Sequence, residues 1–149
     1  MDGSCNRCGD DNNNSIKTLN VGETWVVDGQ WKLTINSVER HNLCNQFSEL
    51  NNLQECIIIT YSYENIGYTD ELFISDFAIY DTEGEAAESY PCTHLKYPKD
   101  CIIGTKCTNV QDAYALYNDS SNITLFLEKY TSSSTSSKIK KVKFNLPVN

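Results

Sequence analysis

The sequence predicts an all-β protein built as an antiparallel sandwich of two sheets. About seven short runs are rich in β-branched and aromatic residues, and several alternate between apolar and polar side chains. Turn residues separate these runs at short spacing, and no run has a strong helical period. Because each such strand has one apolar face, two sheets packed face to face would bury all of these faces.

Two strands open the pattern. Residues 23–28 form the first, which ends at the Asp-Gly turn pair of residues 28–29. Residues 31–38 form the second, with apolar side chains at every second position of its first half. The apolar side chains of this first half lie at odd positions, whereas the apolar Val38 lies at an even one, so we expect a β-bulge near Ser37.

The middle of the chain holds the clearest strand. Residues 40–54 are polar with isolated apolar side chains, a spacing that fits either a short helical turn or a loop. In residues 57–64, isoleucine and tyrosine at the odd positions alternate with mostly polar residues, which predicts one buried face. Residues 72–80 are also strand-like, but the Ser-Asp pair at 75–76 should switch their face midway. A turn at residues 81–84 follows, with glycine at its last position.

The rest of the chain predicts three more strands after a long irregular segment. Residues 85–110 contain two prolines and three cysteines and show no regular period. Residues 113–117, 123–128 and 140–146 then read as strands, and the last two alternate with period two.

Length and charge limit the organisation and the partners. The chain of 149 residues is long enough for one domain, which we place at residues 16–149 after a polar tail or linker at residues 1–15. The formal net charge of −8 excludes nucleic acid as a natural partner, because phosphate binding needs a basic surface. The sequence contains no apolar run of about 18 residues, so we expect membrane attachment only through an anchor.

Four short segments resemble an immunoglobulin-like domain that is common in Gram-positive bacteria. They are Glu-Asn-Ile-Gly at 64–67, the Ser-Asp-Phe and Tyr-Asp strand within 74–84, Val-Gly-Glu-Thr at 21–24 and the last strand at 141–146. The resemblance covers about residues 20–147. It implies an immunoglobulin-like sandwich of seven to eight strands, similar in fold to a mycobacterial secreted immunoprotective antigen. It also implies a secreted protein or surface lipoprotein, and it supplies no catalytic residues.

Seven cysteines favour disulfides and hence an extracytoplasmic location. We expect a bridge between Cys44 and Cys56, which flank the excursion between the second and third strands. One pair is also expected among Cys92, Cys101 and Cys107, and Cys92–Cys101 is slightly favoured over Cys92–Cys107.

Cys5 and Cys8 allow several interpretations. A redox Cys-x-x-Cys needs a helix N-terminus, and a zinc half-site needs a second pair that the sequence does not contain. The small residues Gly3 and Ser4 before Cys5 are typical of a lipidated cysteine, so Cys5 is a candidate lipid anchor. A polar tail with a local disulfide is the remaining alternative.

The sequence predicts neither a catalytic site nor a cofactor. Only His41 and His94 could act as bases at neutral pH, and nucleophile-elbow and zinc-protease motifs do not occur. Cys92 and His94 could in principle bind zinc together with other cysteines, but irregular spacing favours disulfides. We therefore expect that the protein is not an enzyme and holds no metal.

Tyr90, Tyr97 and His94 lie in the irregular segment and are candidates for a binding loop, since loop aromatics often contact partners. The alternative is that the tyrosines cap the core. We expect a non-catalytic binding or accessory module, extracellular or at the cell surface, whose partner is a protein or a cell-envelope component. Two alternatives remain: a small secreted inhibitor or effector that presents residues 85–110 to a protein, and an unrecognised secreted hydrolase.

Overall fold

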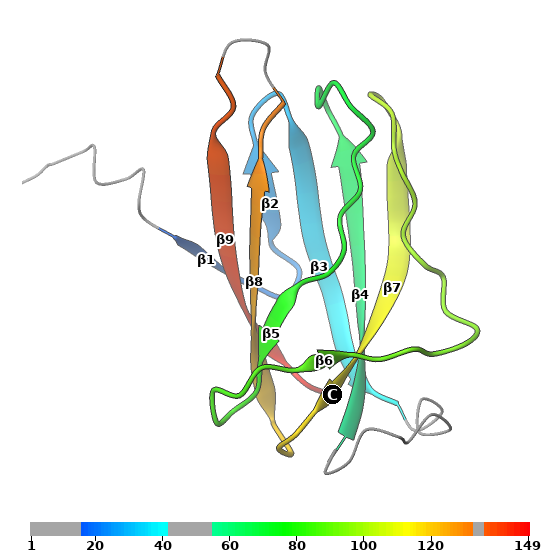
Figure 1. Cartoon of the computed structure of the whole chain (residues 1–149), viewed down its shortest axis with the longest axis vertical. Coiled ribbons are helices and arrows are strands. Elements are labelled where there is room, and N and C mark those ends of the chain that lie inside the picture. Colours follow the sequence, from blue (N-terminus) through cyan, green and yellow to red (C-terminus); the bar gives the residue numbers. More distant parts are fainter. Residues whose placement is uncertain (1–15, 42–54, 133–135) are drawn as a thin grey trace, which may run out of the picture.

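The computed structural model describes residues 16–41, 55–132 and 136–149, and these form two sheets of strands that pack face to face (Figure 1). The described residues contain nine strands and no helix. The strands are β1 (Lys17–Asn20), β2 (Thr24–Val27), β3 (Trp31–Arg40), β4 (Glu55–Asn65), β5 (Ala78–Tyr80), β6 (Glu88–Ser89), β7 (Lys106–Leu116), β8 (Asn122–Tyr130) and β9 (Ile139–Pro147).

The two sheets have the orders β1-β9-β8-β5 and β2-β3-β4-β7-β6. Every pairing is antiparallel except that of β1 with β9, which is parallel. The predicted β-sandwich is confirmed. The strand number is higher than the expected seven to eight, because β1 and β6 are too short to stand out by periodicity.

The core between the sheets follows the predicted alternation. Ile57, Ile59 and Tyr61 of β4 are fully buried and face the second sheet across the core. The expected bulge in β3 is also present, since the register with β4 shifts between Ile35 and Ser37. The bulge turns Val38 back toward the core, where it is buried.

The predicted strand at residues 72–80 is wrong for its first half. Leu72 pairs with Cys101 beside the five-stranded sheet, whereas β5 pairs with β8 in the four-stranded sheet. The chain therefore crosses from one sheet to the other between these points, and Asp76 has a left-handed backbone with φ of 58° at the crossing. The turn after β5 is confirmed, with Gly84 at φ of 83°.

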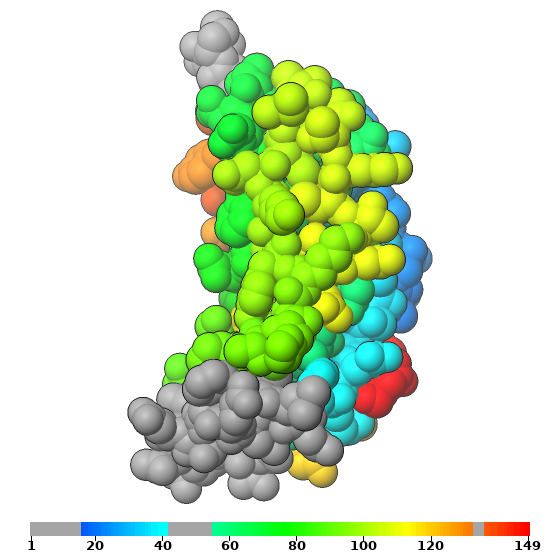
Figure 2. Space-filling view, turned by 90° about the vertical axis from the view of Figure 1, so that its right-hand side faces the viewer, coloured from blue at the N-terminus to red at the C-terminus, as the bar shows by residue number. Residues whose placement is uncertain are grey.

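A second, smaller core lies on the outer face of the five-stranded sheet. Cys56 and Ile58 of β4 and Ala113 and Ala115 of β7 are buried there under Tyr90 and other side chains of the segment that follows β6. Figure 2 shows this part of the chain, coloured yellow-green, running over the side of the sandwich. Both faces of β4 are therefore covered along part of its length.

Some expectations fall outside the described residues. The tail at residues 1–15 and most of the excursion at residues 40–54 belong to this group. Among the residues that are described, no helix has the length and apolar character needed to cross a membrane.

Candidate functional site

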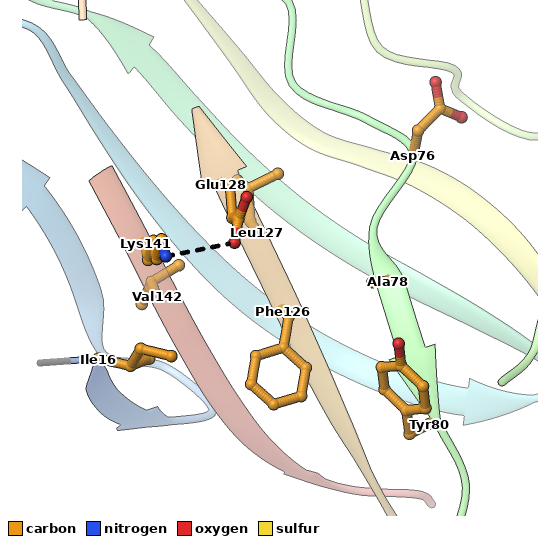
Figure 3. Close-up of a pocket in the computed structure, with 9 residues that line it drawn as sticks. All are labelled: Ile16, Asp76, Ala78, Tyr80, Phe126, Leu127, Glu128, Lys141 and Val142. Atoms are coloured by element: carbon orange, nitrogen blue, oxygen red, sulfur yellow. Dashed lines mark ion pairs between the residues drawn. The ribbon is translucent and has the colours of Figure 1, made fainter. Parts of the chain in front are cut away.

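An open groove lies on the outer face of the four-stranded sheet and has a volume of about 540 Å³ (Figure 3). Its floor and walls come from β5, β8 and β9 and from the residues that precede β1 and β5. The lining residues are Ile16, Asp76, Ala78, Tyr80, Phe126, Leu127, Glu128, Lys141 and Val142.

Strand alternation places the groove side chains. In β8, Leu125 points into the core and is fully buried, so its neighbour Phe126 points outward. The register sets Phe126 beside Ala78 on one side and Lys143 on the other. The small Ala78 side chain leaves the space that the groove occupies.

The groove combines an aromatic surface with opposite charges. The rings of Phe126 and Tyr80 meet edge to face, with centroids 5.8 Å apart and an interplanar angle of 78°. The Lys143 ammonium lies 5.8 Å from the Phe126 ring centroid. Two residues further along β8, Glu128 Oε2 lies 3.8 Å from Lys141 Nζ, and Figure 3 shows this ion pair at one end of the groove. Such a surface suits a ligand with an apolar face and hydrogen-bonding edges.

A buried polar network positions the edge of the groove at Asp76. The buried Asp112 carboxyl accepts a hydrogen bond of 2.9 Å from the Ser75 hydroxyl and lies 2.8 Å from the Tyr61 hydroxyl. The Tyr114 hydroxyl accepts a hydrogen bond of 3.0 Å from the Phe77 amide. These contacts tie the crossing segment on both sides of Asp76 to the five-stranded sheet.

Burial raises the pKa of Asp112 above its ordinary value. Hydrogen bonds from Tyr61 and Ser75 act in the opposite direction, and the nearby Asp76 carboxylate reinforces the rise. Burial, and then the neighbouring Asp112, also raises the pKa of Tyr61 far above its usual range. The Tyr61 hydroxyl therefore stays protonated and acts as a donor.

The sequence patterns single out none of the groove residues as site residues. Phe126 and Tyr80 look like ordinary strand aromatics, and nothing in the sequence shows that β5 pairs with β8. One feature of the sequence could have indicated the groove. Phe126 is large and apolar, yet it occupies an outward position of its strand, between the inward-facing residues. A large apolar residue at an outward position indicates a covered or ligand-binding face.

The three candidate binding-loop residues have different environments. Tyr90 is only 4% exposed and packs in the outer core, so its side chain presents little surface to a partner, and its role in binding stays a prediction. Tyr97 is exposed, and its hydroxyl donates a hydrogen bond to the carbonyl oxygen of Cys92. His94 is also exposed and has a left-handed backbone with φ of 69°. None of the three lines the groove.

The three cysteines of the irregular segment lie in different parts of the fold. Cys92 lies in the outer core, whereas Cys101 packs in the core between the sheets. The five-stranded sheet separates these two cores, so the favoured pairing of Cys92 with Cys101 is wrong. Cys101 Sγ lies 3.1 Å from Cys107 Sγ.

The remaining cysteine predictions stay predictions. Cys5, Cys8 and Cys44 lie outside the described residues, and so the expected Cys44–Cys56 bridge and the lipid anchor are untested. Cys56 itself is buried in the outer core. Within the described ranges, no three His, Cys, Asp or Glu side chains gather as a metal site.

The fold and the groove define a β-sandwich with an open cleft on the outer face of one sheet. Its arrangement is similar to the crystal structure of a candidate lipoprotein from Bacillus subtilis (ycdA), with a TM-score of 0.60 and 14% sequence identity. The match covers 85% of this chain and 39% of the Bacillus protein, so this chain spans about two fifths of that protein's length. At this identity the likeness shows the fold alone. No protein-family model and no curated protein matches the sequence.

Proposed function

We propose that the protein is a non-catalytic binding module of the cell surface or extracellular space, and that its groove binds glycan strands of the cell envelope. The observation that carries the proposal is the aromatic floor of Phe126 and Tyr80, bordered by the ion pair of Glu128 and Lys141. The sugar ring of a glycan has an apolar face that can cover an aromatic ring and hydroxyl groups that can reach charged side chains.

Three further observations support this assignment. The groove is open to solvent and not an enclosed cavity, which suits a polymer better than a small enclosed ligand. The net charge of −8 disfavours polyanionic wall polymers and leaves uncharged sugar backbones as the better partners. The resemblance to immunoglobulin-like domains of Gram-positive secreted proteins, together with the fold shared with a candidate lipoprotein, is consistent with an envelope location.

Sedimentation with insoluble peptidoglycan sacculi tests the proposal. We expect the wild-type protein to sediment with the sacculi and Phe126→Ala to bind about tenfold more weakly, as expected for the loss of one central aromatic contact. Tyr130→Ala is the matched control, because Tyr130 ends the same strand, is 61% exposed and lies outside the groove. Equal binding of Phe126→Ala and wild type would contradict the proposal. Release of soluble sugar from the sacculi would contradict its non-catalytic part.

The second candidate is an inhibitor or effector that presents part of residues 85–110 to a protein. It is favoured by the tip of the loop before β7, where Ile102 and Ile103 are 61% and 51% exposed. This tip is held against the end of β4, since the Gly104 amide donates to Asn65 O at 2.9 Å and the Asn65 amide donates to Thr105 O at 3.0 Å. The double variant Ile102→Ser/Ile103→Ser should abolish protein binding under this candidate and leave sacculus binding unchanged.

The location and the lipid anchor at Cys5 belong to the same proposal. Gly3 and Ser4 precede this cysteine, as small residues precede lipidated cysteines. Cells that express the full-length gene should incorporate a palmitate analogue into the protein, and Cys5→Ala should remove the label. An unlabelled product recovered from the cytosol would overturn both the anchor and the surface location.

A further inference from the structure

Cys101 and Cys107 form a pair of thiols at the end of the core near the Ile102–Ile103 tip. Their sulfur atoms lie 3.1 Å apart, and both thiols are reduced in this structure. A disulfide bond needs about 2.05 Å between the sulfurs, so an approach of about 1 Å would join them.

The backbone fixes both cysteines in this arrangement. Cys101 exchanges two hydrogen bonds of 2.9 Å with Leu72, one in each direction. Cys107 is paired with Tyr63 in the ladder between β4 and β7. Between the two cysteines the chain reverses in a turn in which Gly104 has φ of 88°. The pair is therefore held by the sheet and does not depend on a chance rotamer of a free loop.

The two thiols can lose their protons without leaving the carbonyl oxygen of Lys99 without a hydrogen-bond donor. The Cys107 thiol lies 3.4 Å from the Lys99 carbonyl oxygen, and the Cys101 thiol lies 3.8 Å from the same atom. The Tyr63 hydroxyl donates to this carbonyl as well. After oxidation the Tyr63 hydrogen bond still satisfies Lys99, so the oxidised state has no orphaned polar group at this place.

We propose that Cys101 and Cys107 are a thiol–disulfide exchange site that closes into an intramolecular disulfide around the Ile102–Ile103 tip. The oxidant is a small-molecule or protein disulfide. The Cys107 thiolate attacks one sulfur of the oxidant, forms a mixed disulfide and releases the first thiolate. Cys101 gives its proton to solvent and attacks Cys107 Sγ, which expels the second thiolate. The oxidant gains the two electrons that the cysteine pair loses, and two thiols of the oxidant are produced.

The order of attack follows from burial. Cys107 is half-buried and reachable from solvent, whereas Cys101 is only 3% exposed. Burial, followed by the hydrogen bond and charge of Cys107, raises the pKa of the Cys101 thiol to about 11. Cys101 is therefore the thiol that resolves a mixed disulfide formed on Cys107.

Tryptic mapping after treatment of the full chain with oxidised glutathione tests this site. Lys99 and Lys106 place the two cysteines in different peptides, residues 100–106 and 107–129, whereas Cys92 falls in the peptide of residues 41–96. We expect one disulfide-linked pair of the peptides 100–106 and 107–129, which separates on reduction. Separate peptides with alkylatable Cys101 and Cys107, or a link from either to residues 41–96, would overturn the proposal.

Two single variants test the order of attack. Cys101→Ser should keep one glutathione on Cys107, because the resolving thiol is absent. Cys107→Ser should leave Cys101 without glutathione, because the first attack requires an accessible thiol. A glutathione adduct on Cys101 in the second variant would overturn the assigned order, and circular dichroism of both variants confirms that each is folded when treated.

Discussion

Asp112 gives the most informative perturbation of the core. Its Oδ2 lies 2.8 Å from the Tyr61 hydroxyl and 2.9 Å from the Ser75 hydroxyl, and the Tyr61 hydroxyl also lies 2.8 Å from Ile74 O. These contacts need one more hydrogen than the two hydroxyls supply. The Tyr61 hydroxyl has a single hydrogen for its contacts with Asp112 Oδ2 and Ile74 O. When Asp112 is ionised, one of these two contacts lacks a hydrogen, and protonation of Asp112 supplies it.

The sign of the pH effect follows from the direction of the pKa shift. Burial raises the pKa of Asp112 in the folded protein above the value of about 3.9 expected for an unfolded chain. The folded state therefore holds this proton more tightly than the unfolded state. The resulting stability is fully present below about pH 4 and is lost as the pH rises through the folded pKa. One such group changes the free energy of unfolding by at most about 1.4 kcal/mol per pH unit within that window.

Asp112→Asn keeps the size of the side chain and supplies permanent N–H donors. We expect its free energy of unfolding at pH 7 to equal or exceed that of wild type, with a flatter dependence on pH above pH 4. Asp112→Ala should instead lose about 1–3 kcal/mol, because the Tyr61 and Ser75 hydroxyls lose their partner. Urea denaturation followed by tryptophan fluorescence at several pH values measures all three proteins. The reasoning is refuted if Asp112→Asn loses more than about 1.5 kcal/mol at pH 7 and keeps the wild-type slope.

Three further substitutions test the packing, the first two by urea denaturation and the third by thermal denaturation. Gly67→Ala would place a Cβ 2.3 Å from Gly29 O and should cost about 1–3 kcal/mol; a loss below about 0.5 kcal/mol would show that the two turns separate easily. Phe144→Ala removes a fully buried ring and should cost about 3–5 kcal/mol, and a value typical of a surface site would contradict its place in the core. Burial lowers the pKa of Lys129, whose ammonium lies 4.9 Å from the Tyr68 ring centroid. Lys129→Met should therefore leave the thermal midpoint unchanged or raise it by up to about 3 °C, and a clear fall would mean that the aromatic contacts outweigh the cost of burying the charge.

The sandwich is predictable from the sequence because β4, β8 and β9 each place alternate side chains toward the core between the sheets. Period-two alternation requires only that one face of the sheet be shielded from water. The structure buries the expected side chains of β4 and β9 and two of the three in β8, where Leu127 is half-buried against the core. The first half of β7 is not predictable in this way. Residues 106–109 are polar or half-buried, and the left-handed Asn109 breaks the alternation just before Val110 enters the core.

The candidate site was harder to predict because it depends on which strands become neighbours. Tyr80 and Phe126 meet only because the chain crosses between sheets at Asp76, and local sequence does not encode that partner choice. The expected bridge between Cys92 and Cys101 also depends on an arrangement that local sequence does not encode. Cys92 and Cys101 are close in sequence, yet the five-stranded sheet lies between the two cores that contain them.

The binding face is the central claim, and amide chemical shifts recorded during a titration with soluble peptidoglycan fragments test it most directly. We predict that the largest shifts occur in β5, at residues 124–128 of β8 and at residues 141–145 of β9, and that Phe126→Ala reduces them. Shifts confined to residues 102–104, or no shifts at saturating fragment, would contradict the assignment of the groove as the binding site.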